Sequence, residues 1–138
     1  MTTIDTSAAL SPPRNWTVRL GWGLSGLFIL FMIFDGGIKL VPIDPVIQTM
    51  TELGYPVQYA RLLGVLSLVA TLLYAIPRTS VLGAVLLTAY LGGAVSTHLR
   101  IGSPLFSHTL FGVYMGLFAW GGLWLRNPRL RAIFPVLR

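Results

Sequence analysis

Residues 16–40 read WTVRLGWGLSGLFILFMIFDGGIKL, and this stretch decides the fold. No charge occurs from Leu20 to Phe34, and a helix of the full stretch, at about 1.5 Å per residue, can cross a hydrocarbon core of roughly 30 Å. The stretch is too long for the core of a signal peptide, and no small-residue cleavage site follows its apolar run. We therefore expect a transmembrane helix that stays attached to the chain.

The rest of the chain has the same apolar character. Of its 138 residues 54% are hydrophobic and 10% are charged, and the mean hydropathy is +0.75, whereas soluble domains carry about 25% charged residues. Three further apolar segments occupy residues 56–76, 80–100 and 105–125. The sequence therefore predicts an all-α integral membrane protein, a four-helix bundle in one domain, with a flexible N-terminal tail (1–14) and a basic cytoplasmic tail (127–138).

The positive charges predict the orientation in the membrane. Four crossings place both termini on one side, together with Arg14, Arg19, Arg78 and the four arginines of the C-terminal tail. The other side has three cations, Lys39, Arg61 and Arg100. Seven cations against three make both termini cytoplasmic by the positive-inside rule. Since orientation accounts for the net charge of +6, we expect no nucleic-acid partner.

The connection between the first two spans has internal order, because residues 43–56 read IDPVIQTMTELGYP. Asp44 suits a helix N-cap, Pro45 suits the first turn, and Gly54 suits a C-terminal stop. Val46 and Met50 recur on one face of such a helix. We expect a short amphipathic helix on the outer surface, which either rests on lipid headgroups or covers a site below it.

Ionisable side chains within the spans gather in the leaflet away from the termini, with the exception of Arg19. They are Asp35, Lys39, Arg61, His98, Arg100 and His108. Ionisable groups at membrane depth are costly, and they usually face a bundle interior or a water-filled cavity. We therefore predict an outward-opening polar pocket lined by these residues.

Asp35 is the member of this group that most needs a partner. A carboxylate is short and cannot reach far toward water, whereas Lys39 and Arg100 can extend their charges to the headgroups. Asp35 and Lys39 are four residues apart with the acid first, the better order for a helical ion pair. We expect Asp35 to pair with Lys39 or with Arg61.

His98 and His108 lie at similar depth on neighbouring predicted helices. Such a pair admits axial haem ligation or a metal, but imidazoles near a membrane interface are more often hydrogen-bonded structural groups. Two histidines alone make a weak signal, so we predict no metal site and disfavour haem. A quinone or a lipid remains as a candidate ligand.

Small residues recur every four positions in the third and fourth spans. They are Ala84, Thr88, Gly92 and Ser96 in one, and Gly112 and Gly116 in the other. Such stripes let helix backbones approach closely where lipid surrounds the protein. We expect packing within the bundle, with a homodimer seam as the alternative.

Four pieces of the sequence resemble the DoxX-like family of small bacterial membrane proteins. They are DGGIKL (35–40), LGYP (53–56), IPRTSVLGAVLLTAYLGGAVSTHLRIG (76–102) and GLWLRNPRLRAIFP (122–135). The resemblance implies a bundle of four helices in the bacterial inner membrane, and by position it singles out Asp35, Lys39, Tyr90, Thr97, His98 and Arg100. This sequence departs from the family's pattern at Ser67, because similar proteins often carry a glutamate there. The family's namesake is linked to a quinone-reducing oxidoreductase complex as its membrane subunit.

Two classes of function are consistent with these residues. The chain has no cysteine, which excludes thiol chemistry and iron–sulfur ligation, and no nucleophile–base–acid set or phosphate loop is readable. We therefore prefer a non-catalytic subunit or binding module that holds a lipid, quinone or other small amphiphile and associates with itself or with a membrane-complex partner. The alternative is an oxidoreductase component or a transporter that uses Asp35 and Lys39 to handle a proton or an anion.

Overall fold

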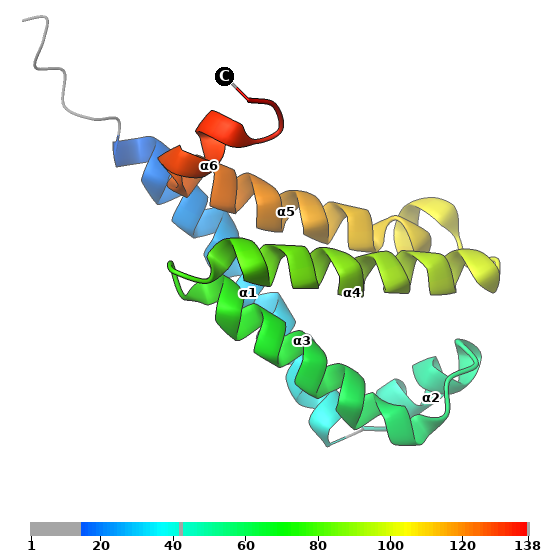
Figure 1. Ribbon diagram of the computed structural model, residues 1–138. Coiled ribbons are helices and arrows are strands. Elements are labelled where there is room, and N and C mark those ends of the chain that lie inside the picture. The colour runs from blue at the N-terminus through cyan, green and yellow to red at the C-terminus, as the bar shows by residue number, and fades with distance from the viewer. Residues whose placement is uncertain (1–14, 42, 138) are drawn as a thin grey trace, which may run out of the picture.

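The computed structural model describes residues 15–41 and 43–137, and every regular element in them is helical (Figure 1). In chain order these are α1 (Asn15–Leu40), α2 (Asp44–Glu52), the 3-10 helix η2 (Val57–Tyr59), α3 (Ala60–Ala75), α4 (Ser80–Arg100), the π-helical turn η3 (Leu105–Thr109), α5 (Phe111–Arg126) and α6 (Pro128–Ile133). The predicted all-α class is confirmed for the described residues, which contain no strand. The N-terminal tail predicted for residues 1–14 lies outside the described residues.

Three helical segments of the described chain are long and apolar enough to cross a membrane. They are Trp16–Leu40, Val57–Ala75 and Ser80–Arg100, with mean hydropathies of 1.7, 1.5 and 1.5. Leu27, Leu30 and Leu72 on their outer faces are 62%, 66% and 61% exposed. Long helices that expose large apolar side chains in this way suit a lipid environment, and the chain is a membrane protein.

The fourth predicted span, residues 105–125, is divided in the structure. The Pro104 carbonyl accepts hydrogen bonds from the amides of both His108 and Thr109, at 3.1 Å each, and the Leu110 amide donates to the Leu105 carbonyl at 2.9 Å. This wide first turn forms η3, so α5 begins only at Phe111. The 16 residues of α5 form a helix about 24 Å long. Without η3, α5 alone is therefore too short to cross a hydrocarbon core of roughly 30 Å.

The four longest helices pack around a shared apolar core. α1 packs against α3 and α5, and α4 packs against the same two helices. Tyr74 of α3 is fully buried in this core, and its hydroxyl donates to the Ala119 carbonyl of α5 at 2.6 Å. The same hydroxyl lies 2.9 Å from the Ser25 hydroxyl of α1. One tyrosine therefore connects three helices through bonds that leave none of its polar atoms unpaired.

The helices separate toward one end of the molecule, where α2 lies (Figure 1). α2 buries Val46 and Met50 next to Ala60 at the start of α3. The helix begins with Asp44 already in its first turn and Ile43 before it, and no side chain caps its amides. The predicted cap role of Asp44 is therefore not found, whereas Pro45 does lie in the first turn.

The glycines after Asp35 differ in what surrounds them. A Cβ at Gly36 would lie 2.6 Å from Cγ of Leu68 on α3, and a Cβ at Gly64 would lie 2.8 Å from the Gly36 carbonyl oxygen. A Cβ at Gly37 would meet no atom within 4 Å. Gly36 and Gly64 therefore bring the backbones of α1 and α3 together, as small residues do between membrane helices.

The predicted small-residue stripes follow the helix contacts over only part of their length. Ala84 is buried, and a Cβ at Gly112 would lie 2.9 Å from Cγ2 of Val95. Gly92 and Gly116, in contrast, would each place a Cβ with no atom within 4 Å. A four-residue step advances about 400° around a helix, so a stripe drifts by about 40° per step and leaves the contact face.

One polar contact between α4 and α5 involves a residue of these stripes. Trp120 of α5 donates its indole N–H to the Thr88 hydroxyl of α4 at 2.7 Å, so Thr88 joins the two helices by a hydrogen bond. Ser96 is exposed on α4. Packing within the chain thus involves Ala84, Thr88 and Gly112, and contact with a second copy through Gly92, Ser96 and Gly116 stays a prediction.

The predicted basic tail forms a short helix over most of its described length. The Asn127 side chain accepts hydrogen bonds from the amides of Arg129 (3.1 Å) and Leu130 (3.2 Å), and thereby caps α6. Leu130 is 5% exposed and belongs to the main core. The chain after α5 is therefore held against the bundle.

Candidate functional site

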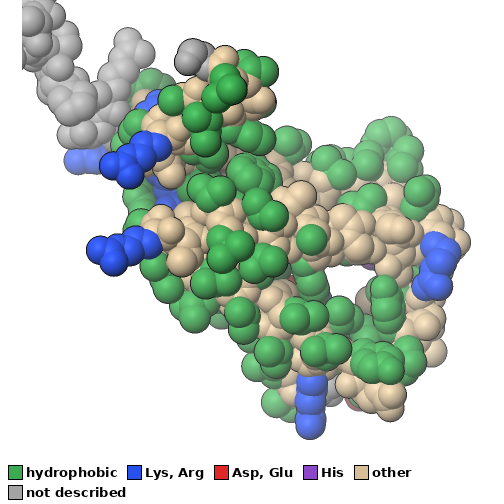
Figure 2. All heavy atoms as spheres, in the orientation of Figure 1, with side chains coloured by type: hydrophobic (Ala, Val, Ile, Leu, Met, Phe, Trp, Pro, Cys, Tyr) green, Lys and Arg blue, Asp and Glu red, His purple; other side chains and the backbone are tan. Residues whose placement is uncertain are grey.

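A cavity of about 490 Å³ lies at the end where the helices separate. Its walls come from the C-terminal part of α1, from α2 and the chain after it, from the start of α3, from α4 and from the segment that begins α5, and Figure 2 shows the hollow in the surface. Most of its lining is apolar. The polar side chains among the lining residues are Asp35, Lys39, Thr49, Tyr55, Tyr90, Thr97, His98 and His108. Apolar walls, a few polar groups and this volume are typical of small-molecule sites.

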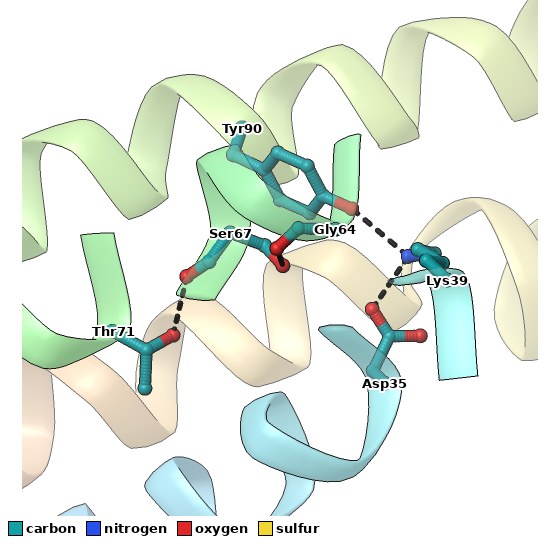
Figure 3. A network of polar contacts seen from close by, with 6 residues as sticks. All are labelled: Asp35, Lys39, Gly64, Ser67, Thr71 and Tyr90. Carbon is teal, nitrogen blue, oxygen red and sulfur yellow. Dashed lines mark hydrogen bonds and ion pairs between the residues drawn. The ribbon is translucent and has the colours of Figure 1, made fainter. Parts of the chain in front are cut away.

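The centre of the polar lining is Lys39, which lies between Asp35 and Tyr90 (Figure 3). Its ammonium donates to Oδ2 of Asp35 at 2.5 Å and to the Tyr90 hydroxyl at 2.9 Å. Both side chains of the ion pair are largely shielded, with 19% of Lys39 and 27% of Asp35 exposed. The predicted pairing of Asp35 with Lys39 is confirmed. Arg61, the alternative partner, is exposed on α3.

Two contacts connect the chain after α2 to α4. The Tyr55 hydroxyl lies 3.0 Å from the Thr97 hydroxyl, which in turn donates to the Gly93 carbonyl at 2.8 Å. Arg100 donates from Nη2 to the Leu53 carbonyl at 2.8 Å. These contacts close one side of the cavity with residues that are more than 40 positions apart in the sequence.

The two histidines lie together at the edge of the cavity, with ring centroids 6.1 Å apart. Nδ1 of His98 lies 3.0 Å from the Ser103 hydroxyl, and Nδ1 of His108 lies 2.7 Å from the Ser107 hydroxyl. Each ring is thus held by a serine close in sequence. The described residues contain no cluster of three or more side chains that could hold a metal.

The sequence model of the DoxX-like family matches residues 23–122, which is most of the chain. The chain belongs to the DoxX-like family. No protein of curated function and no solved structure matches it. In this DoxX-like protein the matched range contains the whole lining of the cavity, from Phe31 to Gly112.

The structure brings together six of the eight side chains that we predicted for the pocket of this DoxX-like protein. Asp35, Lys39, Tyr90, Thr97, His98 and His108 line the cavity. Arg61 and Arg100 do not, since Arg61 points away from the core on α3 and Arg100 is engaged by the Leu53 carbonyl. Whether any of the eight binds a ligand stays a prediction.

Sequence reasoning missed Tyr55 and Gly93 as lining residues. The signal for Tyr55 was the glycine before it, because Gly54 has φ of +77° and turns the chain so that Tyr55 meets α4. Gly93 has no side chain, so it adds open space to the wall. Ser67, the position at which the family resemblance led us to expect a glutamate, is fully buried and donates to the Gly64 carbonyl at 3.1 Å (Figure 3). Lys39 therefore takes its carboxylate partner from its own helix.

Proposed function

We propose that this DoxX-like protein is a non-catalytic subunit or binding module, a transmembrane four-helix bundle that holds a small amphiphile in the cavity beneath α2. The observation that carries the proposal is the Asp35–Lys39–Tyr90 cluster in an otherwise mostly apolar lining. A lipid or a quinone has one polar end and an apolar chain. It can place the polar end at this cluster and the chain along the apolar walls.

The hydrogen bonds of the cluster favour a ligand that offers an acceptor oxygen. An ammonium has three donors, and Lys39 uses two of them on Asp35 and Tyr90. The Tyr90 hydroxyl accepts from Lys39, so its own O–H can still donate. A carbonyl of a quinone or an ester oxygen of a lipid can accept from both groups, while Asp35 balances the charge of the lysine.

In this proposal α2 is an amphipathic cover on the outer surface. Val46 and Met50 are buried and line the cavity, whereas Gln48 and Glu52 are exposed and lie within hydrogen-bonding distance of each other at 3.3 Å. The contacts Tyr55–Thr97 and Arg100–Leu53 hold the end of this cover against α4. A ligand can enter from the lipid side without crossing the main core.

The proposed orientation puts both termini in the cytoplasm of a bacterial inner membrane and the cavity in the outer leaflet. The distribution of positive charge supports this orientation, because the predicted topology puts seven cations on the side of the termini and three on the other side. We expect a fluorescent protein fused after Arg138 to fluoresce and an alkaline phosphatase fused there to be inactive, since the phosphatase matures only outside. An active phosphatase with a dark fluorescent fusion would reverse the orientation.

Filling the cavity tests the binding proposal. A Cβ at Gly93 meets no atom within 4 Å, so Gly93→Leu should fold and extend its side chain into the cavity. We expect the variant to retain several-fold less lipid or quinone than the parent, because about one leucine side chain of cavity volume is lost. The measurement is mass spectrometry of small molecules extracted from the gently purified protein.

Gly92→Leu is the matched control for this experiment. Gly92 is the neighbouring residue on α4, its Cβ is also free of contacts, and it does not line the cavity. Both substitutions improve helix propensity by a similar amount, about 1 kcal/mol in soluble hosts. Equal retention of the same small molecules by the parent and both variants would show that the cavity is not the binding site.

A further inference from the structure

A second, smaller cavity of about 330 Å³ lies at the opposite end of the molecule, near the turn between α3 and α4. Its lining includes Trp22 of α1, Ser80 of α4, Arg126 of α5 and Arg129 of α6. Figure 2 shows Lys and Arg side chains gathered at this end of the bundle. The cavity is separate from the proposed amphiphile site, and no residue lines both.

Arg126 is held in place by neutral groups. Its Nε donates to the Ser25 hydroxyl at 3.0 Å, and its Nη2 donates to the Tyr74 carbonyl at 3.2 Å. The guanidinium carbon lies 4.1 Å from the centroid of the Trp22 ring, a cation–π contact. These contacts fix the guanidinium at the edge of the core without neutralising it.

No carboxylate in the described part of the chain compensates this charge. The one ion pair there joins Lys39 to Asp35 at the other end, and the remaining described acids, Asp44 and Glu52, lie in α2 at that end too. Among the described residues Nη1 of Arg126 makes no hydrogen bond, and no buried side-chain nitrogen or oxygen lacks a partner. Nη1 is therefore accessible and can donate to an outside acceptor.

We infer that this cavity binds the phosphate group of an anionic phospholipid. A guanidinium matches the oxygens of a phosphate, and Arg129 adds a second positive charge at the same cavity. Basic pockets between transmembrane helices are suited to anionic headgroups. Trp22 is 42% exposed beside the cavity, and Leu20 on the same helix is 47% exposed, so an acyl chain has an apolar surface next to the phosphate.

The test is native mass spectrometry of the full chain in detergent, titrated with phosphatidylglycerol or with phosphatidylcholine. We expect the parent to retain phosphatidylglycerol preferentially. Arg129→Gln should weaken that retention about fivefold, since one arginine at a charged surface contributes an effect of that order. Arg129 is exposed, so we expect this variant to fold. Arg126→Gln is a poorer test, because it removes three hydrogen bonds at the edge of the core and the protein can then fail to fold.

Arg78→Gln is the matched control, because Arg78 is exposed at the same end and does not line the cavity. Retention that falls equally in the Arg78 and Arg129 variants would mean attraction by the general positive charge, and would overturn the site. A second arm replaces the lipid by inorganic phosphate. If inorganic phosphate raises the temperature of unfolding as much as phosphatidylglycerol does, the cavity takes a free anion and the lipid assignment is wrong.

Discussion

Gly83→Ala is expected to lower the midpoint of thermal unfolding in detergent by about 10 °C. A Cβ at this position of α4 would lie 2.2 Å from the Tyr74 amide nitrogen and 2.5 Å from the Tyr74 Cα. Both are backbone atoms of α3, which cannot rotate away as a side chain can. The helices must then separate near their turn, and overpacking of a well-packed core costs about 3 kcal/mol.

The separation would also disturb the residue that connects the core. Tyr74 keeps its hydroxyl bond to the Ala119 carbonyl only while α3 stays at its present distance from α5. The control is Gly92→Ala on the same helix, where a Cβ meets no atom within 4 Å. That variant should melt at the temperature of the parent or slightly above it. Its higher helix propensity adds at most about 0.5–1 kcal/mol to the free energy of unfolding. Equal melting of both variants would contradict the close approach of α3 and α4.

The spans themselves could be predicted because their signal is local. A long uncharged run needs no knowledge of the partner helix, and Pro77 ends the second predicted span at a residue that the sequence shows directly. α4 accordingly occupies residues 80–100, the predicted range. The fourth span differs from the prediction because it is divided into η3 and α5. This division depends on two amides, those of His108 and Thr109, that share the Pro104 carbonyl, and composition does not reveal such sharing.

The candidate site was predictable to the extent that its contacts are local. Asp35 and Lys39 share one helix face, so their pairing follows from spacing alone. Tyr90 reaches Lys39 from a position 51 residues away, and Tyr55 meets Thr97 across 42 residues. Such contacts depend on how the helices diverge at this end, which no local pattern encodes.

Arg61 shows the limit of placing a charge by depth alone. Its neighbour Ala60 is fully buried against α2, and this fixes the rotation of α3. A helix turns about 100° per residue, so the next side chain leaves the buried face. Arg61 is therefore exposed, although it stands at the depth expected for a pocket residue. Depth selects the layer of the membrane, while the packing of small neighbours decides the direction of the side chain.

Asp35→Asn is expected to destabilise the protein by about 2 kcal/mol, because it keeps the size of the side chain and removes the charge that balances Lys39. Breaking a fully buried pair by removing one partner costs about 3–5 kcal/mol, whereas an exposed pair contributes about 0–1 kcal/mol. With 27% of Asp35 and 19% of Lys39 exposed, this pair lies between the two limits. The ammonium then has no anionic partner in the described chain, and only neutral oxygens such as the Tyr90 hydroxyl can accept its hydrogen bonds. The midpoint of thermal unfolding in detergent measures the loss.

The double variant Asp35→Asn with Lys39→Met should regain more than half of that loss, because removing both charges leaves no unbalanced ion in the low-dielectric bundle. Asp44→Asn serves as the control, since Asp44 is exposed on α2 and forms no ion pair among the described residues, and it should melt like the parent. A double variant no more stable than Asp35→Asn alone would mean that the carboxylate acts through some partner other than Lys39. The pair would then no longer explain why two opposite charges lie four residues apart at the end of an apolar helix.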